Sequence, residues 1–334
     1  GITFDDALNT ITLNAGVTSQ GVIDFGDNEV ALNTDVTVDS DKGNTIDVLD
    51  IILGGVGETN ATVTLGTNTL TLDSDTGAIL LRDASSGTGG NINIEDAAQL
   101  RLTGGTISID SALDDSIGNM LEGLSESNSA IQVKADTTLK TNGNAMDFSG
   151  NLSSAYGINS PPADAHTLTL NSNNAPVTLE DVGVFTPSFY VLEGLVVDAG
   201  TAAVNLNGNI LTENDINITG DNINLKSTSY TSTSGSLTFN GDVDLAGAGT
   251  TTVTASANSG TGNITFNDVV NDAGSNSPLI LNAPGTTTFG NSIGATSALS
   301  SLTTDAAGTT VSAGATAVET TGNQTYNDPV TLDG

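Results

Sequence analysis

Pairs of aspartates recur at candidate turns, and closely spaced carboxylates are the usual ligands of calcium. Asp39, Asp41, Asp47 and Asp50 occupy positions 1, 3, 9 and 12 of DSDKGNTIDVLD, which resembles the ligand spacing of a calcium-binding EF-hand loop. The segment departs from that pattern, because position 5 is glycine, position 6 is asparagine instead of glycine, and position 12 is aspartate instead of glutamate. No helices are expected beside it. The alternative interpretation is a solvated acidic turn without a metal.

Two further Asp-x-Asp turns extend this hypothesis. Asp73 and Asp75 repeat the first turn, and Asp242 with Asp244 forms a third. The chain has 39 Asp and Glu against 6 Lys and Arg, so we expect divalent cations, with Ca²⁺ the natural candidate, to bind some of these carboxylates. The glycine-rich nonapeptide of calcium β-rolls is absent. The predicted metal ligands are Asp39, Asp41, Asp47, Asp50, Asp73, Asp75, Asp242 and Asp244.

No sequence motif specifies an enzyme. The chain has no G-x-S-x-G, H-E-x-x-H, phosphate-binding loop or dinucleotide fingerprint. A glycosidase needs two carboxylates about 5–10 Å apart, but so many aspartate pairs could satisfy this that the criterion selects none. Sugar-stacking side chains are scarce, with no Trp and only 4 Tyr. The single histidine, His166, follows Pro161-Pro162 and is expected to face solvent. We therefore predict no catalytic residues and no enzymatic activity.

The charge balance excludes several partners. A formal net charge of −33 argues against nucleic acid, whose phosphates must be neutralised by cations, and against an anionic membrane surface. No apolar run is long enough to span a bilayer, so no membrane insertion is expected. The absence of cysteine means that no disulfide stabilises the fold.

Short alternating strands, separated by Gly, Ser, Asn and Asp, run through most of the sequence. In VTASANSGTGNITFNDVV, at 253–270, apolar residues alternate with polar ones on either side of a Gly-rich turn, which predicts half-buried β-strands. Related units recur: Phe239 and Phe266 are 27 residues apart, Phe266 and Phe289 are 23 apart, and TGNITFNDVV and TGNQTYNDPV are 60 apart. These spacings indicate a rung of twenty-odd residues, which is typical of strand solenoids.

The sequence therefore predicts an all-β protein, a parallel β-solenoid rod that forms a single elongated repeat domain over 1–334. Aromatic residues make up only 4% of the chain, which suits a thin core of stacked Val, Ile, Leu and Ala. About fifteen rungs at ~4.8 Å would give a rod on the order of 70 Å long. Tandem antiparallel β-sandwiches are the alternative, since regularly spaced turns suit both folds.

Two excursions are expected to interrupt the strands. Residues 112–127 lose the alternation and place apolar residues at helical spacing, which predicts a short amphipathic helix or an irregular surface loop. Residues 152–164, with Pro161-Pro162, form the second irregular region.

The two ends of the sequence resemble the interior of a repeat. Solenoids need polar caps, because a terminal rung exposes unpaired strand edges, and neither end has the composition of a cap. Joined tail to head, VTLDG and GITFDD restore the strand-turn-strand unit. We expect either that subunits stack head to tail or that the sequence is one period of a much larger repeat protein.

The repeat units resemble those of a known class of exoprotein. GNITFNDVV, GNQTYNDPVTL, GSLTFNGDV and AGTTTVTA are similar to the strand repeats of filamentous-haemagglutinin-like and autotransporter-type adhesin passengers. The resemblance is good from Ala203 onward and weaker before it, and it carries over no individual site residue. It implies a secreted β-solenoid on a bacterial cell surface, used for adhesion, matrix building or spacing.

The leading functional hypothesis is thus an extracellular structural fibre, adhesin or matrix filament. Its partners would be further copies of itself and a cell-surface or glycan receptor. A surface-layer protein is a related alternative that differs in its lateral contacts. A glycan-cleaving β-helix enzyme or tailspike is the rival class, and it would need a groove lined by carboxylates with an aromatic or arginine side chain.

Overall fold

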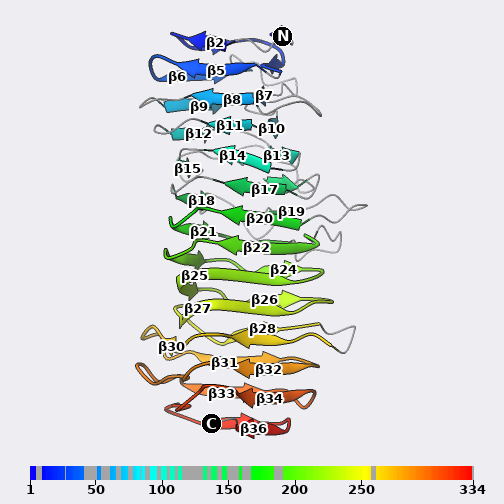
Figure 1. Ribbon diagram of the computed structural model, residues 1–334, viewed down its shortest axis with the longest axis vertical. Coiled ribbons are helices and arrows are strands. Elements are labelled where there is room, and N and C mark those ends of the chain that lie inside the picture. The colour runs from blue at the N-terminus through cyan, green and yellow to red at the C-terminus, as the bar shows by residue number, and fades with distance from the viewer. Residues whose placement is uncertain are drawn as a thin grey trace. The chain divides into compact units, whose positions relative to one another are not determined.

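The computed structural model describes residues 1–4, 10–26, 28–40, 51–53, 145–148, 167–183, 191–256 and 261–332, together with the backbone of the strands between 61 and 159. The described residues form β-strands joined by turns and no helix (Figure 1). Consequently, no described segment is a helix capable of crossing a membrane. The contacts of the chain divide it into two compact units, 1–176 with 184–190 and 177–183 with 191–334. The expectation of one elongated domain over 1–334 stays a prediction.

Each coil of unit 1 contributes strands to three parallel stacks. One stack is a seven-stranded sheet of described strands: β1 (Ile2–Thr3), β4 (Ile23–Asp24), β7 (Ile51–Leu53), β10 (Ala78–Arg82), β13 (Gln99–Thr103), β16 (Ile131–Val133) and β19 (Ile158–Asn159). The second stack contains β2 (Thr10–Leu13), β5 (Glu29–Leu32), β8 (Ala61–Thr64), β11 (Ala84–Ser86), β14 (Thr106–Ile109), β17 (Thr137–Lys140) and β20 (Thr167–Asn171). The third contains β3 (Val17–Thr18), β6 (Val36–Asp39), β9 (Thr69–Asp73), β12 (Asn91–Glu95), β15 (Ala112–Asp114) and β18 (Met146–Phe148).

Unit 2 repeats the three-stack plan. Its six-stranded sheet consists of β24 (Ile210–Thr212), β26 (Ser229–Ser232), β28 (Thr251–Thr254), β31 (Pro278–Asn282), β33 (Ser301–Thr304) and β35 (Gln324–Tyr326). The second stack consists of β22 (Gly194–Asp198), the first halves of β25 (Ile216–Leu225) and β27 (Leu237–Leu245), β29 (Ile264–Phe266), β32 (Thr286–Phe289), β34 (Thr309–Ser312) and β36 (Val330–Leu332). The third runs through β21 (Val177–Leu179), β23 (Val204–Leu206), the second halves of β25 and β27, and β30 (Val270–Asp272).

The strand register confirms the predicted parallel β-solenoid. In the six-stranded sheet, Ile210 pairs with Tyr230, which is 20 residues further on, and Val253 pairs with Leu281, which is 28 residues further on. A rung of twenty-odd residues is therefore correct, and the spacing varies because turns of different length join strands of constant register. Since every strand pairing determined is parallel, the alternative of antiparallel sandwiches is excluded for these strands.

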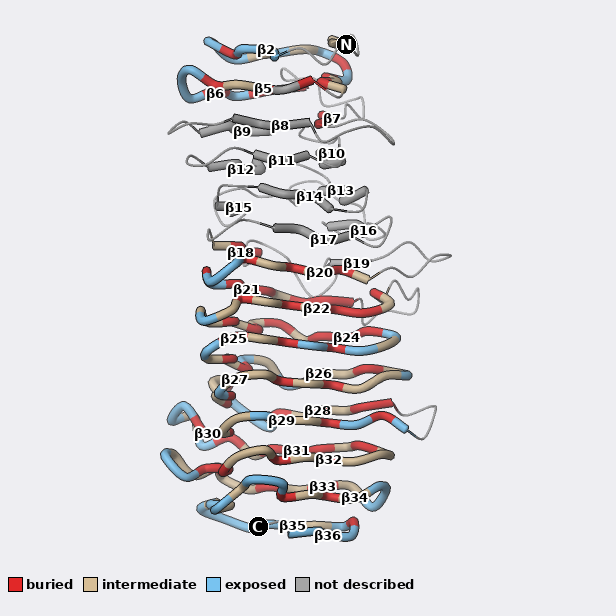
Figure 2. The backbone as a smooth tube through the Cα atoms, in the orientation of Figure 1, coloured by how far each residue is buried: buried red, intermediate tan, exposed pale blue. Residues whose placement is uncertain are grey.

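Inward-facing side chains of neighbouring coils stack into columns that form the core. In unit 2, buried residues alternate with half-buried ones along the strands (Figure 2). One column is aromatic: the Phe266 ring lies 5.0 Å from that of Phe239 and 6.1 Å from that of Phe289, in both cases stacked. All three rings are almost fully buried. Burial of such a side chain contributes about 1.5–3 kcal/mol, so a narrow core suffices when every coil adds to it.

A glycine allows two coils to approach closely at a corner of unit 2. Strands β25 and β27 bend together at Gly220 and Gly241, where their register shifts. Gly241 has φ of 142°, and a Cβ at this position would overlap the carbonyl oxygen of Gly220. Only glycine satisfies both the positive φ and the close backbone contact.

Sequence similarity between repeat units does not always mean the same place in a coil. Phe266 of TGNITFNDVV lies on β29 and pairs with Phe239 and Phe289, in the second stack. Tyr326 of TGNQTYNDPV lies on β35 and pairs with Thr304, in the six-stranded sheet. The 23- and 27-residue spacings are thus true rungs, whereas the 60-residue spacing joins strands of different faces.

The predicted excursions are strands where the structure describes them. Residues Ala112–Asp114 form β15 and pair with β12 and β18, so no helix begins at Ala112. Ile158–Asn159 form β19 and pair with β16. The rest of 112–127 and of 152–164 lies outside the described residues, and the excursions there stay a prediction.

Candidate functional site

Two of the predicted metal ligands occupy equivalent positions in unit 1. Asp39 ends β6 and Asp73 ends β9, and the two are register partners. Asp73 is in turn the register partner of Glu95, at the end of β12. The first aspartates of the two Asp-Ser-Asp segments therefore end strands that stack directly on each other, which the sequence did not reveal. Neighbouring strands are about 4.8 Å apart, so three acidic residues occupy successive positions of one column.

Four of the other predicted ligands lie outside the described residues. They are Asp41, Asp47 and Asp50 of the loop-like segment and Asp75 of the second Asp-x-Asp turn. The metal-binding role of this group stays a prediction. His166, which we expected to face solvent, also lies outside them.

The third predicted pair lies on β27, next to the corner at Gly241. Asp244 accepts a hydrogen bond from the Asn222 side chain at 2.8 Å, which ties β27 to β25. Asp242 is exposed, and its pKa is raised above its ordinary value. Partial desolvation is the main cause, followed by repulsion from Asp268, Asp221 and Asp244, while the N–H of Val269 opposes the shift.

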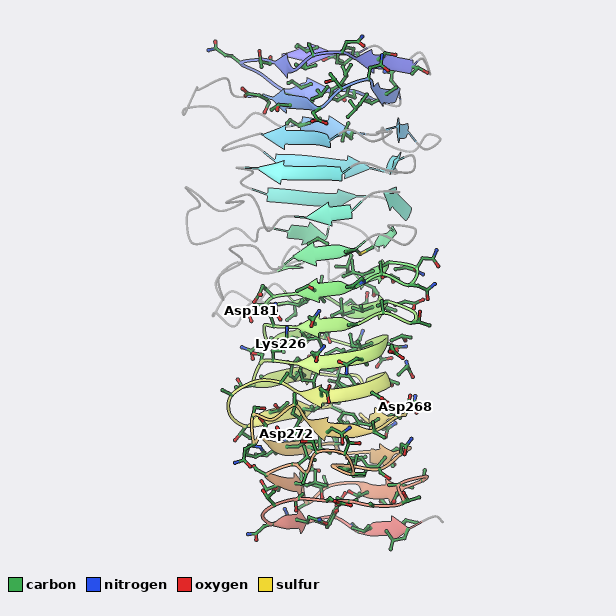
Figure 3. The ribbon with its side chains drawn as sticks, turned by 90° about the vertical axis from the view of Figure 1, so that its left-hand side faces the viewer. Asp181, Lys226, Asp268 and Asp272 are labelled. Carbon is green, nitrogen blue, oxygen red and sulfur yellow. The ribbon has the colours of Figure 1, made fainter. Side chains whose placement is uncertain are left out.

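The acidic corner of unit 2 thus carries unbalanced negative charge. Three successive coils each contribute one aspartate to this corner: Asp221, Asp242 and Asp268. Figure 3 shows Asp268 on the opposite side of the view from Lys226, and Lys226 is the one Lys or Arg whose side chain the structure describes. Among the described side chains, no three His, Cys, Asp or Glu come close enough together to hold a metal ion. The carboxylates of this corner therefore repel one another, and the metal-binding role of Asp242 and Asp244 stays a prediction.

Sequence reasoning missed Asp272, whose carboxylate accepts four hydrogen bonds. Its oxygens accept hydrogen bonds from the backbone N–H groups of Gly274, Asn276 and Ser277, at 2.9–3.1 Å, and from the hydroxyl of Ser275 at 3.0 Å. Burial acts to raise its pKa, but these four donors outweigh it and lower the pKa below the ordinary value. The signal was present as an Asp followed by Gly, Ser and Asn, which favours a turn closed by the carboxylate.

Asp328 is a second carboxylate that sequence reasoning missed. It is 8% exposed and accepts hydrogen bonds from the hydroxyls of Thr304, at 2.6 Å, and Thr310, at 2.9 and 3.0 Å. Both threonines are buried. No local pattern predicts this arrangement, because the three residues belong to two coils and meet only when the coils stack.

The outward polar side chains bond mainly along the stack. Asn240 donates to the side-chain oxygens of Asn217, at 2.9 Å, and Thr219, at 3.1 Å, and Asn267 donates to Asn240 at 2.6 Å. A second pair of amides bonds in the same way in the third stack, where Asn224 donates to the side-chain oxygen of Asn205 at 3.2 Å. These side chains hold successive coils in register and do not converge on a common point.

Comparison of the chain with protein-family models, with curated proteins and with solved structures finds no match. The β-solenoid class is therefore established by strand pairing alone. The resemblance to adhesin passengers stays an expectation from the sequence.

Proposed function

We propose that this chain is a structural, non-enzymatic β-solenoid module of a secreted fibre, adhesin or matrix filament on a bacterial cell surface. The observation that carries the proposal is the use of the outward polar side chains. The ladder of Asn217, Asn240 and Asn267 commits amides that could bind a ligand to coil-to-coil hydrogen bonds. A surface whose polar groups are used internally suits a spacer or scaffold better than a catalytic groove.

The charge and composition support an exposed, solvated location. A net charge of −33 with no cysteine suits a protein that keeps its surface hydrated and does not depend on redox state. The extracellular and bacterial parts of the proposal rest on the repeat resemblance.

The proposal is tested by locating the protein on the cells that produce it. Antibodies raised against the purified chain should label intact cells in immunogold electron microscopy, on material that extends from the surface. Labelling that requires permeabilised cells would contradict the proposal. In parallel, the purified chain should release no reducing ends from a panel of neutral and acidic polysaccharides, and measurable turnover of any of them would favour the enzymatic alternative.

We further propose that Ca²⁺ binds the acidic column at Asp39 and Asp73. Its support is their register pairing, which places the two aspartates at equivalent positions of adjacent strands. Like charges at such spacing repel each other, and a divalent cation would convert this repulsion into attraction.

Thermal unfolding with calcium tests this second proposal. Millimolar CaCl₂ should raise the midpoint for the wild type, because a ligand that binds only the folded state stabilises it. The double substitution Asp39→Asn and Asp73→Asn should abolish the shift, whereas Asp35→Asn, which removes an exposed charge outside the column, should retain it. An equal shift with NaCl of the same ionic strength would show screening alone and would contradict specific binding.

A further inference from the structure

Three polar side chains of unit 2 form one column beside the third stack. Glu180, Asn207 and Lys226 come directly after β21, β23 and β25, whose last residues are register partners. The ladder continues through them, because the backbone N–H of Asn207 donates to the carbonyl of Leu179 at 2.8 Å. In the same way, the N–H of Lys226 donates to the carbonyl of Leu206 at 2.9 Å. Neighbouring strands are about 4.8 Å apart, so an acid, an amide and an amine occupy successive positions of the column.

The side-chain amide of Asn207 has a hydrogen-bond partner on one side only. Its Nδ2 donates to Oε1 of Glu180, on the preceding coil, at 2.9 Å. Its Oδ1 is buried without a partner, and no other buried side-chain nitrogen or oxygen in the described part of the chain is left so. Buried polar atoms are almost always paired. Since the nitrogen is directed to Glu180, the orphaned oxygen turns away from that carboxylate.

The neighbour of this amide on the following coil is Lys226. Its side chain is exposed and makes no ion pair with a carboxylate in the described part of the chain. The backbone around it is fixed, since the N–H of Ser227 donates to the hydroxyl of Tyr230 at 2.9 Å. Figure 3 shows Lys226 on the same side of the view as Asp181, which follows Glu180 in the sequence. A lysine amine on its flexible four-carbon stem can therefore reach the side chain one coil away.

We propose that the side chains of Lys226 and Asn207 join in an intramolecular isopeptide bond, and that Glu180 is the catalytic residue for its formation. The order of the column carries the proposal. The acid bonds to the nitrogen that must leave, and the amine that must attack lies on the coil at the other side of the same amide. Holding the three groups in this order makes the encounter intramolecular, which removes much of the entropic part of the barrier.

The reaction exchanges one amide for another. The neutral Nζ of Lys226 attacks Cγ of Asn207, so that a new C–N bond forms and the bond from Cγ to Nδ2 breaks. The Glu180 carboxylate takes a proton from the attacking amine and passes it to Nδ2, with which it is already in contact. The products are one secondary amide and one ammonia. No electrons are transferred, so the step needs no oxidant, reductant or further reactant.

The isopeptide bond ties two neighbouring coils together covalently. The chain has no cysteine, so a disulfide cannot supply such a link. A crosslink of this kind restricts the unfolded chain as a disulfide does, and an amide does not respond to the redox state of its surroundings. The bond would therefore hold adjacent coils in register under conditions that reduce disulfides.

Mass spectrometry of the purified chain provides the first test. The wild type should be lighter than its sequence mass by one ammonia, and the segments that contain Asn207 and Lys226 should be recovered as one crosslinked species. Trypsin gives an independent readout, because it does not cut after an acylated lysine. Residues 141–226 and 227–334 should stay joined in the denatured chain, since Lys226 is its last Lys or Arg. A wild type of full sequence mass that is cut after Lys226 would overturn the proposal.

Two substitutions test the assigned roles. Lys226→Arg keeps the charge but removes the nucleophile, so the ammonia should be retained and trypsin should cut at this position. Glu180→Gln keeps the shape but removes the proton carrier, and the yield of the crosslink should fall about tenfold or more. Loss of ammonia that persists in Lys226→Arg would identify a succinimide between Asn207 and Gly208 instead. That result, or a wild-type yield in Glu180→Gln, contradicts the proposal.

Asn214 supplies a matched control within the same unit. Its Nδ2 donates to Oε1 of Glu193 at 3.2 Å, again between neighbouring coils, but Gly235, which packs on its backbone from the next coil, brings no amine. The Asn214 peptide should keep its full mass, and Glu193→Gln should leave the crosslink at Asn207 unchanged. If Asn214 lost ammonia as readily as Asn207, contact with a glutamate would be sufficient and the proposed role of the lysine would be wrong.

Discussion

Replacing Phe266 by alanine should open the aromatic column at its centre. The Phe266 side chain is fully buried, and its ring is stacked on one ring from each neighbouring coil, at 5.0 and 6.1 Å. Truncation of a buried Phe to Ala costs about 3–5 kcal/mol, of which the two aromatic contacts account for about 0.5–1.5 kcal/mol each. The neighbouring Phe239 and Phe289 cannot close the cavity without leaving the backbone register that spaces the coils.

The loss should be local, because a coil in a solenoid contacts only its neighbours. A decrease of about 3–5 kcal/mol corresponds to an increase of roughly 10²–10⁴-fold in the population of the locally open state. Hydrogen exchange measured by mass spectrometry should accelerate by that factor in peptides that cover β27, β29 and β32. Two reporters are the amides of Asn267 and Gly290, which donate to the carbonyls of Phe239 and Phe266.

Thr265→Ala is the matched control, since Thr265 lies on the same strand and is only half-buried. It should change the free energy of opening by no more than about 0.5 kcal/mol. Phe266→Leu should lie between the two variants. If Phe266→Ala accelerates exchange less than tenfold, or accelerates it equally in unit 1 and unit 2, the column does not stabilise the coils in the way we describe.

Three further substitutions probe the acidic groups and the glycine corner. Asp242→Asn should raise the thermal midpoint at pH 7, because the raised pKa of Asp242 means that its charged form is disfavoured in the folded state. This gain in midpoint should vanish below the ordinary pKa of 3.8, where the carboxyl is neutral in both states, and it should shrink in ~1 M salt. Asp272→Ala should cost about 1–3 kcal/mol in urea unfolding, since it leaves three backbone N–H groups without their acceptor. The lowered pKa of Asp272 implies that its contribution is complete above 3.8 and is lost as the pH falls through the folded-state pKa, so the wild type and variant should converge in strong acid. Gly241→Ala should destabilise unit 2 by more than Gly249→Ala, because both have positive φ but only a Cβ at Gly241 overlaps a backbone carbonyl; equal midpoints would show that the close approach is unimportant.

The apolar alternation predicted an all-β fold and favoured the solenoid over antiparallel sandwiches, and the parallel strand pairing then excluded the sandwiches for these strands. A strand such as Leu237-Thr238-Phe239 has one apolar and one polar face whatever strand it pairs with, and the return of that pattern every twenty-odd residues favours stacked coils. Rung spacings of 23 and 27 read from Phe239, Phe266 and Phe289 are the register pairs of the structure. Local periodicity was reliable here because a strand's two faces are determined by its own residues.

The candidate sites were less predictable, because carboxylates in this chain differ by their surroundings and not by their local sequence. Asp242 and Asp272 both lie on strands, β27 and β30, yet one has a raised pKa and the other a lowered one. In the first case partial desolvation and the carboxylates of neighbouring coils raise the pKa, and in the second a turn rich in N–H donors lowers it. Asp328 meets Thr304 and Thr310 only through the stacking of coils.

By itself, then, the sequence determined that the chain forms short strands with one buried face, that these strands recur at rung spacing, and that the surface is strongly acidic. Only the tertiary structure decided which strand belongs to which face of the coil. TGNITFNDVV and TGNQTYNDPV are nearly the same in sequence, yet they lie in different stacks. The physical reason is that all faces of the coil require the same alternation of apolar and polar residues, so the number of residues in the intervening turns, and not the strand itself, determines the face on which each strand lies.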